Sequence, residues 1–297
     1  MFILFVLITC SLYSQEFCVA TYNVRNQNSW DSINGNAWSQ RCPYICEQIN
    51  FEQPAVFGSQ EVLHGQLMDM LKLLKDYDYI GVGRDDGVQG GEYSPILYNT
   101  NKVEKLDGGW FWLNTAPDKP IKGWDAACIR ICTWGRFKDK LTGRIFCFFT
   151  LHMDHVGVIA RRESALLIVE KVKEIAKNDP AIVTGDFNVD QNNEIYSIFT
   201  NSGILNDSYD VARQKFAPNG TFNSFDPSLK TLSRIDHIFV SPTIEILNYA
   251  IMTNTYWTCT NTAMDKQGND APTEISLNNC QQRCPSDHWP VFVRLKL

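Results

Sequence analysis

The sequence predicts an α/β or α+β protein in which two β-sheets pack face to face, with helices on their outer faces. Helical segments alternate with strand-like segments near the N-terminus, whereas paired strand-like segments dominate the middle of the chain. Elements with one apolar face are stable only when they pack in layers of this kind. The chain has 297 residues, of which 44% are hydrophobic and 20% charged. This length and composition are sufficient for a large buried core.

The expected strands are short runs of apolar, β-branched and aromatic residues between turn-forming residues. They cover residues 17–24, 55–62, 93–98, 102–106, 129–137, 144–151, 181–184, 235–240 and 289–295. The strands at 93–98 and 102–106 are interpreted as adjacent, with a turn at 99–101, and 129–137 is expected to pair with 144–151. Residues 145–149 are apolar on both faces, which indicates a central strand.

Three segments are expected to form helices, at residues 38–49, 66–74 and 158–177. The last is the clearest, because Ala165, Ile168 and Val172 repeat at the 3–4 spacing of one buried stripe. Residues 253–284 are polar and rich in turn-forming residues, so we expect a long surface insertion there. No repeat or flexible linker divides the chain, which favours one compact domain.

The first 15 residues predict a signal peptide, because an apolar run at residues 2–8 is followed by small and polar residues. We therefore expect export to a periplasmic or extracellular location, and a folded domain that covers residues 16–297. Attachment of a lipid at Cys10 is an alternative that the short preceding run fits poorly, and a buried first strand is another. No other segment is long enough to span a bilayer.

Residues 16–297 contain nine cysteines, and an odd number leaves at least one thiol outside any intramolecular disulfide. An exported protein can keep disulfides, but the sequence does not show which residues pair. Cys18, Cys132 and Cys147 lie in apolar runs and are expected to be buried. The spacing of Cys280, Cys284 and His288 is too incomplete for a zinc site.

Acidic, amide and imidazole side chains gather at the ends of the expected strands. They are Asn23, Glu61, His152, Asp186, Asn188, Asp236, Asp287 and His288. Each alone is most simply a turn or capping residue. Together they can meet at one rim of a pair of sheets, where the apolar strands would hold them rigidly.

Such a group of side chains supports metal-assisted chemistry on a phosphate ester. Glu61, helped by Asp287 or Asn23, offers the hard oxygen ligands that suit Mg²⁺, with Mn²⁺ as a possible substitute. Asp186 can orient or deprotonate an attacking water, and Asn188 can donate a hydrogen bond to a phosphoryl oxygen.

Two histidines complete the expected site. His152 and His288 can donate protons to the phosphoryl oxygens where negative charge builds up. A histidine in this role needs an acidic partner that fixes its proton. Asp236 is the candidate partner of His288, and Glu92 that of His152.

The order of these residues resembles the endonuclease/exonuclease/phosphatase superfamily. The matching stretches are Thr21-Tyr22-Asn23-Val24-Arg25, Ser59-Gln60-Glu61, Thr150-Leu151-His152, Gly185-Asp186-Phe187-Asn188, Arg234-Ile235-Asp236-His237-Ile238-Phe239 and Ser286-Asp287-His288. The resemblance implies a four-layer α/β sandwich, with residues 16–297 as the catalytic domain. It also implies that Glu61 is the main metal ligand and that His152 and His288 contact the scissile phosphate, while the identity of the general base stays open.

Further motifs are similar to those of an exported bacterial branch related to the deadenylase-like group. They are Gly83-Arg84-Asp85-Asp86-Gly87, Gly91-Glu92-Tyr93, Trp110-Phe111-Trp112-Leu113, and His152-Met153-Asp154-His155 with Arg161-Arg162. In this interpretation Arg84 contacts substrate, although a surface ion pair fits it equally well. Trp110, Trp112 and Phe222 are candidates for the mouth of the pocket, although strand aromatics usually belong to the core.

The expected function is hydrolysis of a phosphate ester, with a phosphodiester as the favoured substrate and the protein acting as a monomer. A nuclease acting on DNA or RNA is one alternative, which the net charge of −6 disfavours only weakly. A sphingomyelinase-like enzyme is another, with Tyr256-Trp257 as a candidate lipid contact. The third is a binding module without catalytic activity, which the complete set of reactive residues disfavours.

Overall fold

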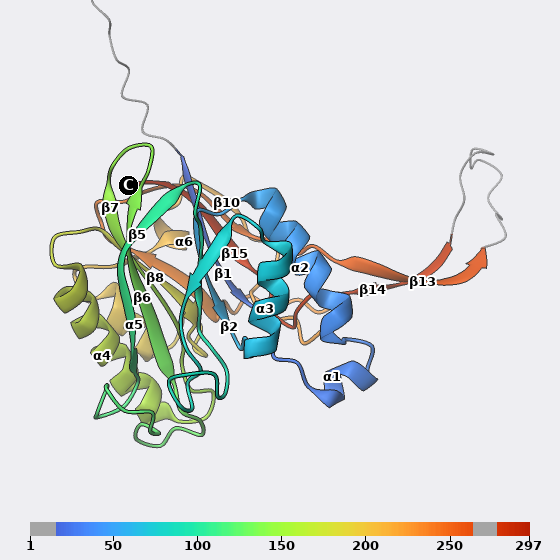
Figure 1. Ribbon diagram of the computed structural model, residues 1–297, viewed down its shortest axis with the longest axis horizontal. Helices are drawn as coiled ribbons and strands as arrows, with labels where there is room; N and C mark the ends of the chain where they lie inside the picture. The colour runs from blue at the N-terminus through green and yellow to red at the C-terminus, as the bar shows by residue number, and fades with distance from the viewer. Residues whose placement is uncertain (1–15, 264–277) are drawn as a thin grey trace, which may run out of the picture.

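The structure is a computed structural model that describes residues 16–263 and 278–297, and two large β-sheets face each other in it (Figure 1). The expected signal peptide and Cys10 lie outside the described residues. In spatial order, the strands of the first sheet are β10 (Gln214–Phe216), β12 (Glu245–Ile251), β15 (Val291–Lys296), β1 (Phe17–Asn23), β2 (Val56–Gln60), β4 (Ile96–Asn99) and β3 (Tyr77–Ile80). Those of the second sheet are β5 (Val103–Trp112), β6 (Ile131–Asp139), β7 (Ile145–His152), β8 (Ala181–Asp186), β11 (Asp236–Val240) and β9 (Asn206–Asp207).

Helices cover the outer face of each sheet, which gives four layers and confirms the predicted fold class (Figure 1). Apolar side chains of α2 and α3 pack on the first sheet, and those of α4 and α5 pack on the second. A third apolar cluster fills the space between the sheets. The helices are α1 (Ser29–Ile33), α2 (Trp38–Glu52), α3 (His64–Leu73), α4 (Val158–Ala176), α5 (Glu194–Thr200) and α6 (Ser208–Val211).

The strand directions bring the polar strand ends to one rim. In the first sheet β1 runs parallel to β2 and antiparallel to β15, so both β1 and β2 end where β15 begins. In the second sheet β7 runs parallel to β8, and β8 is antiparallel to β11. The side chain of Gln60 crosses between the sheets and donates to Thr150 Oγ1 over 2.9 Å. The two rims are thereby held together.

One strand pairing predicted from the sequence is wrong. The segments at 93–98 and 102–106 do not pair, because β4 belongs to the first sheet and β5 to the second. The turn between them carries the chain from one sheet to the other, and Lys102 N donates to Asn99 O within it over 3.0 Å. The two segments would show the same alternation of apolar residues whether they paired with each other or belonged to different sheets, so the sequence could not distinguish these arrangements. The predicted pair formed by β6 and β7 is confirmed, and β7 is a central strand.

The expected insertion at 253–284 contains a two-stranded hairpin that projects from the body of the molecule (Figure 1). Its strands are β13 (Tyr256–Ala263) and β14 (Asn278–Arg283), and the disulfide Cys259–Cys280 joins them. Cys280 is therefore not available as a zinc ligand. Tyr256 is buried and stacks on Tyr44, whereas Trp257 is 56% exposed. Within the described residues, no helix combines the length and apolar character that a membrane crossing requires.

Candidate active site

Polar side chains from both sheets line a pocket of about 430 Å³ at the shared rim. Nine of the predicted site residues line it: Glu61, Arg84, Glu92, His152, Asp186, Asn188, Phe222, Asp287 and His288. Asn23 and Asp236 do not line the pocket, but each bonds directly to residues that do. The side chains that the sequence separates by up to 265 positions therefore form one group.

Asn23 joins the two sheets within this group. Its Nδ2 atom donates to Glu61 Oε1 and to Asp186 Oδ2, each over 3.0 Å. Glu61 and Asn188 have φ angles of 61° and 51°, in the left-handed region that few residues other than glycine adopt. Each follows the end of a buried strand, where the backbone turns sharply. Backbone strain of this kind is concentrated at functional sites.

The acidic residues in the pocket are buried close to one another. Burial and the nearby charge of Asp236 raise the pKa of Asp186 to about 7. Burial also raises the pKa of Asp287. The guanidinium of Arg25 lies 3.8 Å from Glu61 and 3.6 Å from Asp287, but its shortest bond, of 2.8 Å, is to Asp31. A further cation at the site would therefore stabilise the charged forms of these carboxylates.

The donor set fits a divalent cation that prefers oxygen. Ligand atoms of Glu61, Asp186 and His288 lie within 4.8 Å of one another. We assign His288 to proton donation and not to the metal, because Asp236 Oδ2 contacts its Nδ1 and favours the charged imidazole, which has no free electron pair to offer a metal. The carboxylates of Glu61 and Asp186, with Asp287 beside them, are hard oxygen donors of the kind that Mg²⁺ and Mn²⁺ favour.

Asp236 holds the proton of His288, as the sequence predicts. His288 Nδ1 lies 2.9 Å from Asp236 Oδ2. Burial alone lowers the pKa of His288, but the charge and hydrogen bond of Asp236 raise it well above its usual value. The other ring nitrogen, Nε2, faces Asp186 Oδ2 at 3.7 Å. His288 thus presents a charged N–H group to the pocket.

His152 is neutral and has a different neighbour from the one predicted. Burial, followed by the charges of Arg130 and Arg84, lowers its pKa well below the usual value. The Asn188 amide nitrogen lies 3.1 Å from its Nε2 and Asp186 Oδ2 lies 3.4 Å from the same atom, whereas Nδ1 has no hydrogen-bond partner. The predicted pairing of Glu92 with His152 is therefore wrong.

Glu92 binds Arg84 and Asn26 instead. Its Oε2 lies 2.5 Å from Arg84 Nη1, and its Oε1 accepts from Asn26 over 3.1 Å. A guanidinium offers a carboxylate more donors than a neutral imidazole does. The spacing of the residues along the chain cannot show whether Glu92 binds Arg84 or His152. The prediction that Trp112 lines the pocket is also wrong. Its indole is buried behind the loop that carries Arg84 and Glu92, and it donates to Arg84 O over 2.7 Å.

The family to which this site belongs follows from comparison with known proteins. The model of the endonuclease/exonuclease/phosphatase family matches residues 20–288. The chain belongs to the endonuclease/exonuclease/phosphatase family. Members of this family are hydrolases of phosphate esters, and the predicted resemblance is confirmed.

Three known proteins are similar to this chain. A mannosyl-6-phosphatase of Bacteroides thetaiotaomicron is 48% identical, with a TM-score of 0.87 over 95% of this chain and 100% of its own. A Bacteroides vulgatus member is 38% identical, with a TM-score of 0.81 over 95% of this chain and 99% of its own. An uncharacterised protein of Acanthamoeba polyphaga mimivirus is 32% identical over 161 residues. That alignment covers 52% of this chain and 60% of the viral protein.

Sequence reasoning missed five polar residues of this family member's pocket. They are Arg25, Asn26, Cys128, Arg130 and His155. Arg25 and Asn26 follow the Asn23 motif directly, so their place at the end of β1 was a usable signal. Cys128 lies in the irregular segment before β6, and Arg130 lies there too, although the sequence predicted a strand that begins at residue 129.

Proposed function

We propose that this protein is a divalent-metal-dependent phosphatase that hydrolyses a phosphate monoester of a small sugar. The arrangement of Asn23, Glu61 and Asp186 beside the charged His288 carries the proposal, because it places hard oxygen ligands next to a proton donor. Glu61, with Asp287 beside it, would hold Mg²⁺ or Mn²⁺. When bound, the metal would neutralise charge on the phosphoryl oxygens and on the attacking water.

The chain's own residues would accept the proton of the attacking water and stabilise the charge that develops. An attacking water gives a proton to Asp186, whose raised pKa suits a base that works near neutral pH. The water oxygen bonds to phosphorus while the bond from phosphorus to the ester oxygen breaks. The charged N–H of His288 stabilises the phosphoryl oxygens. The Asn188 amide, for which the sequence predicted the same role, instead contacts His152 Nε2 and donates to Met153 O. The alcohol leaves on the opposite side and takes its proton from solvent.

The choice of a monoester departs from the phosphodiester expected from the sequence. It is supported by the relative described as a mannosyl-6-phosphatase, which is 48% identical over 95% of this chain. The pocket volume of about 430 Å³ is also suited to a small ligand. The hydrolysis of nucleic acids and of sphingomyelin remain alternatives that the same assay can separate.

A metal-dependent activity panel tests the proposal. It compares hexose phosphates, inositol phosphates, dinucleotides, oligonucleotides and sphingomyelin, with Mg²⁺, with Mn²⁺ and with EDTA. We expect the highest kcat/KM on a hexose phosphate, and no turnover in EDTA. Asp186→Ala and His288→Ala should each lower kcat by about 10³-fold or more. Undiminished rates in both variants, at unchanged Tm, would contradict the assignment of the site.

We also propose that the protein is exported. The apolar run at residues 2–8 supports this, as does the disulfide Cys259–Cys280, because disulfides persist in oxidising compartments. Mass spectrometry of the protein secreted by its native host tests it. We expect an N-terminus close to residue 15 and an oxidised Cys259–Cys280 pair. An intact Met1 in the cell lysate would contradict export.

A further inference from the structure

Cys128, Arg130 and His155 line the pocket and have no part in the proposed hydrolysis. They come from two loops that lie next to each other, one before β6 and one between β7 and α4. The second loop begins directly after His152, the last residue of β7. After burial, the charge of Arg130 contributes most to lowering the pKa of His152. These residues therefore lie beside the reactive centre.

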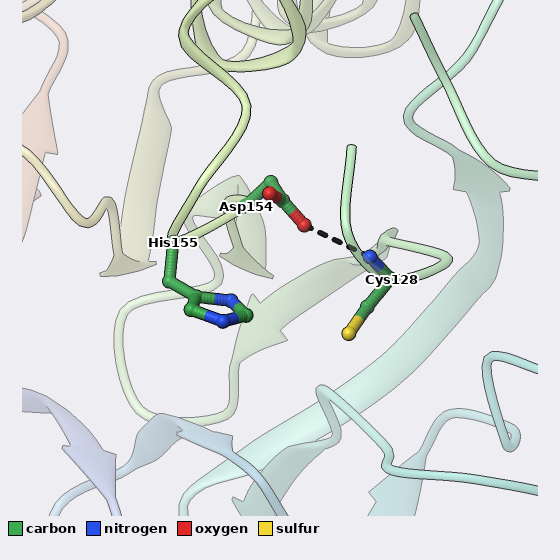
Figure 2. A group of neighbouring side chains, drawn as sticks. All are labelled: Cys128, Asp154 and His155. Carbon is green, nitrogen blue, oxygen red and sulfur yellow. Dashed lines mark hydrogen bonds between the residues drawn. The ribbon is translucent and has the colours of Figure 1, made fainter. Parts of the chain in front are cut away.

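Asp154 fixes the two loops to each other. Its carboxylate accepts hydrogen bonds from the backbone N–H groups of Ala127, Cys128, Val156 and Gly157 and from Arg130 Nε, at distances of 2.8 to 3.2 Å. Figure 2 shows this carboxylate between the loops, with its bond to Cys128 N. So many donors on one buried carboxylate make this part of the pocket rigid.

These side chains do not form a second metal site, although Cys128, Asp154 and His155 have potential ligand atoms within 4.8 Å of one another. The hydrogen bonds just described already use both oxygens of Asp154. Arg130 Nη2 lies 3.0 Å from His155 Nδ1, so a cation bound there would meet a guanidinium. A cluster that already holds an arginine in this way repels a metal ion.

The same bonds orient two donors. A guanidinium only donates, so His155 Nδ1 accepts from Arg130 and the ring proton lies on Nε2. The His155 side chain is exposed at the pocket and its Nε2–H is available to a ligand. Arg130 is 4% exposed, and its Nη1 atom has no hydrogen-bond partner. A buried donor without a partner is costly, so a ligand oxygen that approaches it is favoured.

The charges nearby select a neutral ligand group. The carboxylate of Asp154 offsets Arg130, and that of Glu92 offsets Arg84. A second anionic group on the substrate would meet Glu92 in the same pocket. A hydroxyl group is compatible with both the positive and the negative side chains here, because it can accept from Arg130 or His155 and donate to a carboxylate. An apolar group would leave the Arg130 donor unpaired.

We propose that Arg130, His155 and Cys128 form a subsite that binds the hydroxyl-rich leaving group of the substrate. We call these three residues the leaving-group subsite. The inference rests on the proposed phosphatase function, because it takes the scissile phosphoryl group to lie beside His152 and His288. It assigns specificity to residues that carry out no step of the hydrolysis.

Kinetics on two substrates test the subsite. Mannose 6-phosphate carries hydroxyl groups on its leaving group, whereas phenyl phosphate carries none. Loss of a hydrogen bond to a charged or oriented donor corresponds to about a 10-fold to 100-fold loss of affinity. His155→Ala and Arg130→Met should therefore lower kcat/KM on mannose 6-phosphate by at least about 10-fold through KM, and change it on phenyl phosphate by less than about 3-fold.

Two matched variants control for structural damage. Val156→Ala changes an exposed neighbour of His155, and Arg136→Met removes a half-exposed arginine of β6. Both should leave the ratio of the two substrates unchanged. If His155→Ala, which alters an exposed side chain, leaves this ratio at the wild-type value, the subsite is overturned. Equal losses on both substrates in a stably folded Arg130→Met variant would also overturn it.

Alkylation of Cys128 gives a readout that does not depend on catalysis. Among the described free cysteines, Cys128 is partly exposed and the other six are buried. In EDTA, mannose 6-phosphate should slow the reaction of iodoacetamide with Cys128 several-fold more than inorganic phosphate does at equal concentration. Equal protection by both would overturn the subsite. If no phosphate ester is hydrolysed but this protection is seen, the proposed function fails and the subsite stands.

Discussion

Asp236 Oδ2 lies 2.9 Å from His288 Nδ1, and this buried contact holds a proton on the imidazole that faces Asp186. The pair joins β11 of the second sheet to the segment that leads into β15 of the first. The contact therefore requires the two sheets to be in register with each other. It couples the assembly of the sandwich to the charge state of its reactive centre.

Asp236→Asn should reduce catalysis without unfolding the protein. An amide in place of the carboxylate keeps the shape but removes the charge that holds the His288 proton, so kcat should fall by about 10²-fold or more. The pH range over which the remaining activity is seen should move downward, because His288 would lose its proton at a lower pH. Steady-state kinetics between pH 5 and pH 9 measure both effects. Asp226→Asn, at a partly exposed loop position that does not line the pocket, is the control.

The metal-free protein should become more stable as the pH falls from 8 to 7. His288 has a raised pKa, so its stabilising charge is complete below about 6.5 and is lost at higher pH. Asp186, with its pKa raised to about 7, also takes up a proton in the folded state over this range. The gain is about 1 to 2 kcal/mol, or a rise in Tm of a few degrees.

The lower limit of this pH window is set by two other histidines. Burial lowers the pKa of both His152 and His237, so the unfolded chain gains protons that the folded chain does not as the pH falls below 6.5. Differential scanning calorimetry in EDTA at pH 7, 7.5 and 8 checks the prediction. A Tm that rises with pH across this interval would contradict the charge states assigned to His288 and Asp186.

Glu61→Gln should remove most of the metal response. The variant keeps the hydrogen-bonding shape toward Asn23 but offers Mg²⁺ a neutral oxygen, so the affinity should fall by about 10-fold or more. In the wild type, saturating Mg²⁺ should raise Tm by mass action on the folded state, and in the variant this shift should be small. Glu104→Gln, at an exposed position of β5, is the matched control. An equal Mg²⁺ shift in wild type and Glu61→Gln would rule out Glu61 as the main ligand.

The sequence was sufficient for those parts of the site that lie at strand ends. Asn23, Asp186 and His288 are placed by the apolar runs beside them, and a period of two residues determines which way the side chains point. The pairing of Glu92 with Arg84 could not be predicted, because it depends on how the loop at residues 81–95 folds over β5. The same limit applies to Arg130 and His155, which one buried aspartate brings together from two loops.

Arg41 should be essential for the shape of the active site, although it lies outside the pocket. Its buried guanidinium donates to the backbone oxygens of Val24, Arg25, Asn36 and Pro285, over distances of 2.7 to 3.1 Å. It thereby ties the segment after Asn23 to the segment before Asp287. No carboxylate is hydrogen-bonded to this guanidinium in the described part of the chain. The hydrogen bonds to these four carbonyl oxygens therefore offset the free-energy cost of burying its charge.

Arg41→Met keeps much of the side-chain volume but leaves four carbonyl oxygens without this donor. The free energy of unfolding should fall by about 3 kcal/mol or more. Urea denaturation measures it, with the exposed Arg294→Met as the control. At a temperature where Arg41→Met is folded, its Mg²⁺ affinity should also fall, because Asn23 and Asp287 are no longer held in place. Arg41→Lys should restore part of both losses, since an ammonium group can reach some of the same carbonyls. A folded Arg41→Met protein with wild-type Mg²⁺ affinity would show that the two segments hold their positions without the arginine.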